Sequence, residues 1–285
     1  MNPTLSTRQV QQGQSQKLMI FVLSMALFGL GDLVTEMIPD VAIGSIELGI
    51  PYFGFIGLIL VMLLNPFYAA LGASVGEVIF SDLLMGDFGG LGEIEGVLTL
   101  FIGLYIAGLM VKNLKSKASI AAAGMVGVAV EQVLSGLADC IKVWIGVSDI
   151  DAIKGLPESI LVLEIIECSM EFVVAGIIVG IIPAMYLIPR LHGKIEPLLG
   201  MKPREGSISK VAAGSFLALA AGVFVVAMLF GVLGEVVDIG AWKPDFIDQF
   251  GDGFVWIGIV IAAVVVAIVF FIKSKSRNKE YTRAG

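Results

Sequence analysis

The charged residues of this chain are sorted by position, and that sorting constrains the fold more than any other feature. Eight apolar stretches alternate with short polar loops. Nearly all lysines and arginines fall in one alternate set of loops, whereas nearly all acidic residues fall in the other set or inside the stretches. Because 57% of the residues are hydrophobic, the composition is that of a membrane protein and not of a soluble domain.

The apolar stretches predict an all-α polytopic membrane bundle with about eight transmembrane helices, since one crossing needs about 20 apolar residues. The second and third helices are expected to form a tight hairpin broken at Asn65–Pro66. The sixth stretch is too long for one straight crossing, so we expect it to tilt or bend near Pro183. The predicted spans are 18–37, 50–65, 66–84, 94–113, 118–146, 157–190, 209–237 and 252–273.

The basic loops orient these spans, because positively charged loops remain in the cytoplasm. The pattern predicts a multi-pass protein of the cell membrane with both termini cytoplasmic. Lys154 and Lys243 lie outside in this topology, and Lys142 lies near the outer end of the fifth span. The residues expected on the cytoplasmic side are Arg8, Lys17, Lys112, Lys115, Lys117, Arg190, Lys194, Lys202, Arg204, Lys210, Lys273, Lys275, Arg277, Lys279 and Arg283.

Several classes of function find no support in the sequence. The net charge of −7 comes mostly from external and intramembrane acids, so we expect no nucleic-acid partner. His192 is the only histidine, and Cys140 and Cys168 are too few for a disulfide framework. The chain contains no H-E-x-x-H or Walker A motif. We therefore expect neither an enzyme nor a cofactor, and the sequence leaves a metal site undecided.

Acidic residues inside the predicted spans are the strongest functional signal. A charge at the centre of a membrane helix costs roughly 2.5–3.5 kcal/mol, so these groups must face a hydrated cavity, pair with cations or be protonated. Lys142 is the one basic residue near them and cannot neutralise them all. The acids and their polar neighbours form four helical stripes: Asp32, Thr35 and Glu36; Ser74, Glu77, Ser81 and Asp82; Glu131, Ser135 and Asp139; Glu164, Glu167 and Glu171.

We predict that Glu77, Glu131, Glu167 and Glu171 face one outward-facing cavity that binds a cationic ligand. For the acids nearer the helix ends, simple solvation at the interface is an equal alternative; these are Asp32, Glu36, Asp82, Asp139 and Glu158. An indole can stack on a cation, so Trp144 joins the candidates, with a place in the aromatic belt as the alternative. The candidate substrate-binding residues are Glu77, Glu131, Ser135, Asp139, Glu164, Glu167, Glu171 and Trp144.

Small residues at four-residue spacing predict close packing between helices rather than chemistry. The patterns are Gly72-x-x-x-Gly76, Gly176-x-x-x-Gly180 and Gly214-x-x-x-Ala218-x-x-x-Gly222.

A longer motif covers residues 38–113. The loop segment Ile50-Pro51-Tyr52-Phe53-Gly54 leads into a small-residue hairpin, Asn65-Pro66-Phe67-Tyr68-Ala69-Ala70-Leu71-Gly72-Ala73-Ser74-Val75-Gly76-Glu77, followed by Ser81-Asp82-Leu83-Leu84 and the Gly-rich span from Gly96 to Gly108. This order resembles the substrate-binding S components of energy-coupling factor (ECF) transporters. The chain departs from that family in two respects. Its first span lacks the small-xxx-small docking pattern, because Ser24 pairs with Phe28 and Ala26 with Leu30, and spans seven and eight are additional.

The resemblance implies a solute-binding subunit of an importer, powered by a separate transmembrane coupling subunit and ATPase subunits. Its ligand would be a cationic vitamin-like metabolite or a metal cation. The implied organisation is a flexible cytoplasmic tail (1–17), a six-helix substrate-binding bundle (18–190), a cytoplasmic loop (191–208), two additional helices (209–273) and a basic cytoplasmic tail (274–285).

Three other functions stay open. The acids also fit a stand-alone secondary transporter or cation channel that uses them as coupling sites. An intramembrane enzyme with paired carboxylates is weaker, because no nucleophile or histidine base accompanies them. A structural subunit of a membrane complex would use the acids only as a surface.

Overall fold

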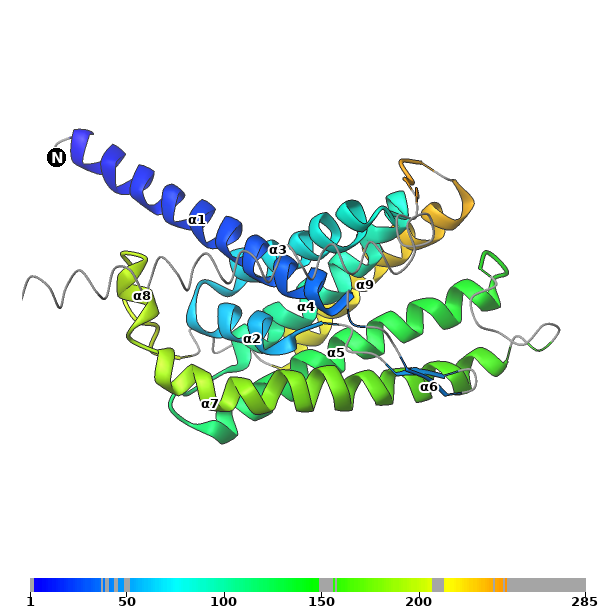
Figure 1. Ribbon diagram of the computed structural model, residues 1–285. Coiled ribbons are helices and arrows are strands. Elements are labelled where there is room, and N and C mark those ends of the chain that lie inside the picture. The colour runs from blue at the N-terminus through cyan, green and yellow to red at the C-terminus, as the bar shows by residue number, and fades with distance from the viewer. Residues whose placement is uncertain are drawn as a thin grey trace, which may run out of the picture. The chain divides into compact units, whose positions relative to one another are not determined.

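The computed structural model describes residues 3–36, 38, 41–43, 46–48, 52–148, 156, 158–206, 213–237, 239–242 and 244 (Figure 1). Residues Met1–Lys243 form one compact unit, and Pro244–Gly285 form another. The seventh predicted span therefore belongs to the same unit as the first six. The predicted eighth span, 252–273, and the basic tail, 274–285, lie outside the described residues.

The described part is helical apart from one small hairpin. Helix α1 (Pro3–Glu36) begins well before the first predicted span, so a helix replaces most of the flexible tail expected over 1–17. Pro3 suits the first turn of a helix, where no amide hydrogen is needed, and the glutamines that follow are good helix formers. Strands β1 (Val41–Ile43) and β2 (Ile46–Leu48) then pair in antiparallel fashion, with Val41 opposite Leu48.

The predicted hairpin between the second and third spans is confirmed. Helix α2 (Gly54–Leu63) ends just before Asn65, whose side chain accepts hydrogen bonds from the backbone amides of Phe67 and Tyr68 and so caps α3 (Pro66–Glu77). With 10 residues, α2 is about 15 Å long, which is half the thickness of the hydrocarbon layer. It is therefore a half-length helix.

Two helices change from α to π geometry along their length. Helix α3 continues as the π-helix η1 (Val78–Leu83). Helix α6 (Ser159–Glu171) continues as the π-helix η3 (Phe172–Ile181) and then as α7 (Ile182–Leu191). Pro183 lies at the start of α7, so the irregular stretch precedes this proline.

The remaining helices complete the unit. A 3-10 turn, η2 (Gly90–Gly92), leads into α4 (Glu93–Met110). Helix α5 (Lys117–Trp144) follows, and the short α8 (Ile195–Leu198) precedes α9 (Ala213–Val236). Among the described residues, five helical stretches are long and apolar enough to cross a membrane: Gly13–Glu36, Gly90–Met110, Lys117–Trp144, Ser159–Leu191 and Ser215–Val236. They coincide with predicted spans one, four, five, six and seven.

Glycines set the distances between neighbouring helices, as predicted for two of the three patterns. A Cβ atom at Gly72 or Gly76 would lie 2.3 Å from a backbone oxygen of α1, so α3 packs directly against the α1 backbone. Gly176 and Gly180 likewise face Val128 and the backbone near Gly54. On α9, Gly222 has nothing within 4 Å among the described residues, so the packing role of the third pattern stays a prediction.

Loops assigned by the sequence to the same side of the membrane meet one another. On the side predicted to be outside, Phe88 and Trp242 exchange backbone hydrogen bonds of 3.1 and 2.8 Å. On the other side, the Gln16 amide donates to the Gly200 carbonyl oxygen at 3.0 Å. These contacts fit the predicted alternation of loops, while its direction relative to the cytoplasm stays a prediction.

One arginine joins three helices on that second side. Arg204 Nη1 donates to the carbonyl oxygens of Val61 and Met62 at 3.0 and 3.2 Å, and Nη2 donates to that of Gly108 at 2.7 Å. Its own carbonyl oxygen lies 2.7 Å from Nε2 of His192, just beyond α7. A single guanidinium thus caps the C-terminal turns of α2 and α4, where carbonyl groups lack partners within the helix.

Candidate functional site

A buried tyrosine lies at the centre of the predicted acidic stripes. Tyr52 immediately precedes α2 and is 7% exposed. Its hydroxyl donates a hydrogen bond of 2.8 Å to Oε2 of Glu131, in the middle of α5. The side-chain amide of Gln132 lies 3.5 Å from the other oxygen of Glu131. Sequence periodicity did not indicate Tyr52, because it lies in a loop and belongs to no helical stripe.

Two more of the predicted acids share this neighbourhood. Besides Glu131, both Glu77 and Glu171 lie close enough to act electrostatically on the Tyr52 hydroxyl. Glu171 acts on Glu131 as well. The structure therefore brings together carboxylates from α3, α5 and α6. We call these four residues (Tyr52, Glu77, Glu131 and Glu171) the Tyr52 cluster.

Glu77 has an oxygen atom without a hydrogen-bond donor. Its Oε2 atom is buried and accepts no hydrogen bond from the described residues. Its strongest electrostatic neighbours are further acids, Asp32 and Asp82. Asp32 accepts a short hydrogen bond from the Ser81 hydroxyl, which links α1 to η1. A buried acceptor among other carboxylates is unfavourable unless a proton or a cation joins it.

Both helix irregularities adjoin this cluster. Glu77 is the last residue of α3 before η1, and Glu171 is the last residue of α6 before η3. Stretches of π-helix are uncommon and occur frequently at functional sites, because they re-aim side chains relative to a regular helix. Two of the three carboxylates are thus held at positions where the backbone geometry changes.

The third carboxylate is positioned by close helix packing. A Cβ atom at Gly103 of α4 would lie 2.6 Å from Cβ of Glu131 and 2.8 Å from the Gly127 carbonyl oxygen. The α4 backbone therefore passes directly beneath Glu131. Any side chain at position 103 would displace α5 or the Glu131 side chain.

The other predicted site residues lie elsewhere. Glu164 contacts the α5 surface near Gly136, since a Cβ atom there would lie 3.1 Å from Oε2 of Glu164. Glu167 is exposed on α6, and Trp144 is 54% exposed at the end of α5. Ser135 is half-buried on α5. Of the predicted site residues, Glu77, Glu131 and Glu171 act on Tyr52, and exposed Glu167 does not; that they form one binding site stays a prediction.

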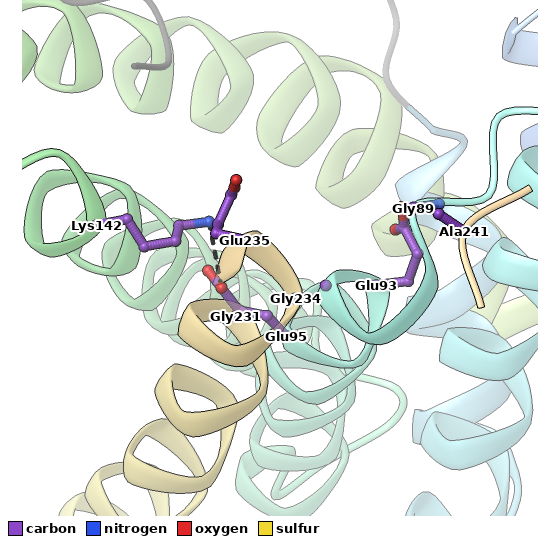
Figure 2. Close-up of a pocket in the computed structure, with 9 residues that line it drawn as sticks. Gly89, Glu93, Glu95, Lys142, Gly231, Gly234, Glu235 and Ala241 are labelled. Atoms are coloured by element: carbon purple, nitrogen blue, oxygen red, sulfur yellow. Dashed lines mark hydrogen bonds and ion pairs between the residues drawn. The ribbon is translucent and has the colours of Figure 1, made fainter. Parts of the chain in front are cut away.

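Asp139 belongs to a second charged group, nearer the loops predicted to lie outside. Lys142 Nζ lies 2.8 Å from Oδ1 of Asp139. The same atom lies 3.2 Å from Oε2 of Glu95 (Figure 2). Glu95, in the first turn of α4, was not predicted as a site residue. A signal was available, because acids favour the first turn of a helix and this one follows a Gly-rich turn at a span boundary.

Beside this ion group lies a cavity of about 610 Å³ (Figure 2). None of the acids of the Tyr52 cluster lines it, so this cavity is distinct from the predicted one. Its lining residues are Gly89, Gly92, Glu93, Glu95, Lys142, Gly231, Gly234, Glu235 and Ala241. We call it the outer cavity. Within the described residues, no group of three or more His, Cys, Asp or Glu side chains has an arrangement that could hold a metal ion.

Comparison with known proteins gives the family. No curated protein and no solved structure matches the chain. Residues 19–282 match a protein family described as a family of unknown function, DUF8171. Because the match covers nearly the whole chain, this protein belongs to the DUF8171 family.

Proposed function

We propose that this protein is a membrane-embedded subunit that binds a cationic solute at the Tyr52 cluster. The observation that carries the proposal is the buried Oε2 of Glu77, which accepts no hydrogen bond from the described residues. Glu131 accepts the hydrogen bond of the Tyr52 hydroxyl, and Glu77 and Glu171 lie near enough to act electrostatically on the same hydroxyl. A bound cation with N–H or O–H donors would supply both the missing charge and the missing hydrogen bonds.

Lys142, the basic residue that the sequence places near the acids, does not neutralise this cluster. Lys142 is held by Asp139 and Glu95 at 2.8 and 3.2 Å. A charge in the membrane interior is costly, so an arrangement of several carboxylates persists when it serves an ion or substrate pathway. We propose a binding role and no catalytic one, because the cluster combines carboxylates with a phenol and lacks a nucleophile–base pair.

The resemblance to an ECF S component supports an importer. The small-residue hairpin of that resemblance is the observed α2–α3 hairpin, and Tyr52 precedes its half-length helix. Half-length helices often form the substrate sites of membrane transporters. Under this proposal the solute comes from outside the cell, and separate coupling and ATPase subunits provide the energy.

Docking to a coupling subunit would differ from that family. On α1, Ser24 and Phe28 are buried inside the unit, at 0% and 1% exposure. The opposite face of α1 presents exposed apolar side chains, including Leu18, Val22 and Leu27. We therefore propose that any coupling subunit contacts this exposed face, which lacks the small-residue pattern.

A second candidate is a stand-alone secondary transporter or cation channel. The favouring observation is that Glu93, which lines the outer cavity, acts on Asp82 and Glu77. Acidic groups thus continue from the cavity toward the Tyr52 cluster. Purified protein in liposomes separates the two candidates, since cation uptake without any other protein supports the transporter and its absence alongside retained binding supports the subunit.

Replacing Glu131 with Gln tests the binding site, because it keeps the shape and removes the charge. We expect cation binding to weaken by about 1.5–3 kcal/mol, the value of one hydrogen bond to a charged group. Ligand-dependent thermal shifts of the purified protein with a panel of candidate cations measure this. Glu158→Gln is the matched control, since Glu158 is exposed at the start of α6. Equal ligand shifts in Glu131→Gln and wild type would refute the assignment.

A further inference from the structure

The outer cavity carries a second group of charges that the proposed function does not use. Three carboxylates line it, from Glu93, Glu95 and Glu235. Lys142 contributes the single ammonium group among its described lining residues (Figure 2). Negative charge therefore exceeds positive charge among the lining residues that the structure describes.

Lys142 shows that an ammonium group fits between these carboxylates. Its Nζ atom is 2.8 Å from Asp139 and 3.2 Å from Glu95, distances near those of charge-assisted hydrogen bonds. The Lys142 and Glu95 side chains are only 9% and 8% exposed. The ammonium group thus lies in a largely desolvated place, where its interaction with carboxylates is stronger than in water.

The carboxylates keep capacity for a further donor. Glu95 Oε2 is 3.2 Å from the Lys142 ammonium, and no other donor among the described residues reaches this buried atom. Glu93 accepts a hydrogen bond from the Gly89 amide at 3.0 Å and also contacts the Asp82 carboxyl group. A carboxylate can accept about four hydrogen bonds, so both groups have room for N–H donors of a guest molecule.

The shape of the cavity favours a small organic molecule. Four of its lining residues are glycines, so backbone rather than side chains forms much of its wall. Helix α9 packs closely against the residues of this wall: a Cβ atom at Gly231 would lie 1.6 Å from Oε2 of Glu95, and one at Gly234 would lie 2.4 Å from the Gly92 amide nitrogen. Its volume of about 610 Å³ is in the range of small-molecule sites and larger than a bare ion needs.

We propose that the outer cavity binds a small organic ammonium ion through Glu93, Glu95 and Glu235, with Lys142 as a tethered competitor for Glu95. The N–H groups of the guest donate to the Glu95 oxygen that Lys142 now contacts, and to carboxylate oxygens that Lys142 does not contact. This site is separate from the Tyr52 cluster and does not depend on the function proposed for that cluster.

The test is a calorimetric titration of the full-length protein in detergent with 1,4-diaminobutane as the probe. We expect wild-type protein to bind it, and to bind tetramethylammonium at least about tenfold more weakly, because that ion has no N–H donors. Glu95→Gln should weaken binding of the diamine about tenfold or more. Lys142→Met should tighten it about tenfold, because the internal competitor is gone. Glu158→Gln, outside the cavity, should bind as wild type.

Glu95→Gln and Lys142→Met are expected to change the affinity in opposite directions. Misfolding cannot explain both results, since an unfolded variant cannot gain affinity. Equal affinities in wild type, Glu95→Gln and Lys142→Met would overturn the proposal. So would binding by Lys142→Met alone, because Lys142 would then keep every guest out of the natural protein. Binding that is lost in Glu131→Gln and kept in Glu95→Gln would place the diamine in the Tyr52 cluster, which overturns this inference and supports the proposed function.

Discussion

Replacing Arg204 with Met should destabilise the protein more than any other change to a basic residue of its loop. The substitution removes three hydrogen bonds, of 3.0, 3.2 and 2.7 Å, from the carbonyl oxygens of Val61, Met62 and Gly108. All three acceptors lie in the last turns of α2 and α4, and these residues are buried. A methionine side chain has no hydrogen-bond donor, so it cannot replace the guanidinium.

The magnitude follows from the number of bonds and their surroundings. A hydrogen bond contributes about 1 kcal/mol net, and more when one partner is charged. Burial opposes this gain, since it lowers the pKa of the Arg204 guanidinium, although arginine stays protonated at neutral pH. We therefore expect a loss of about 3 kcal/mol and a fall in melting temperature of about 6–12 °C. Arg204→Lys should lose most of this too, because one ammonium group cannot span two helices.

A thiol-reactive dye can follow this unfolding, because Cys140 is buried and Cys168 is half-buried in the folded protein. Lys202→Met is the matched control, since Lys202 is an exposed basic residue of the same loop. If Arg204→Met melts at the same temperature as Lys202→Met, the guanidinium does not stabilise the two helix ends and the reasoning is refuted.

Three further predictions concern the site and the topology. Gly103→Val should reduce cation binding without changing a charge, because a Cβ atom there would lie 2.6 Å from Cβ of Glu131. Gly96→Val on the same helix, where a Cβ atom meets nothing within 4 Å, serves as the control in the same thermal-shift series. Cation affinity should fall as the pH is lowered from about 7 to about 4.5, since protonation removes the carboxylate charge, and a flat profile would contradict a carboxylate site. Tags at 115 and 200 should be cytoplasmic, and tags near 90, 152 and 246 should be external, as the charge pattern predicts. Labelling with a membrane-impermeant reagent measures this, and labelling from outside at position 200 would disprove the topology.

The sequence predicted the long helices well because length and apolarity are sufficient to identify a membrane span. Three of the acids that it selected, Glu77, Glu131 and Glu171, act on the Tyr52 hydroxyl in the structure, and each lies on a polar stripe of an otherwise apolar helix. Tyr52 was missed because a loop residue has no periodicity to mark it. The π-helical stretches after Glu77 and Glu171 were missed because apolar residues fit either helix geometry.

The pattern of charges along the sequence also gave an incomplete account of two basic residues, Arg204 and Lys142. Arg204 was counted only as a cytoplasmic positive charge, whereas its guanidinium caps two helices far from it in sequence. Lys142 was expected near the acids, but its contact with Glu95 depends on how α4 and α5 pack. Contacts of this kind arise from tertiary structure, which neither hydropathy nor loop charge encodes.

The position of Arg204 in the chain also has a consequence for biogenesis. It follows Met62 by 142 residues and Gly108 by 96 residues. At a synthesis rate of about 5–20 residues per second, roughly 7–28 s pass between synthesis of the end of α2 and synthesis of the arginine that caps it. The helices before it must therefore remain in the membrane in a provisional arrangement while translation continues. We expect the newly made protein to become resistant to proteolysis only after the ribosome has released the segment that contains Arg204.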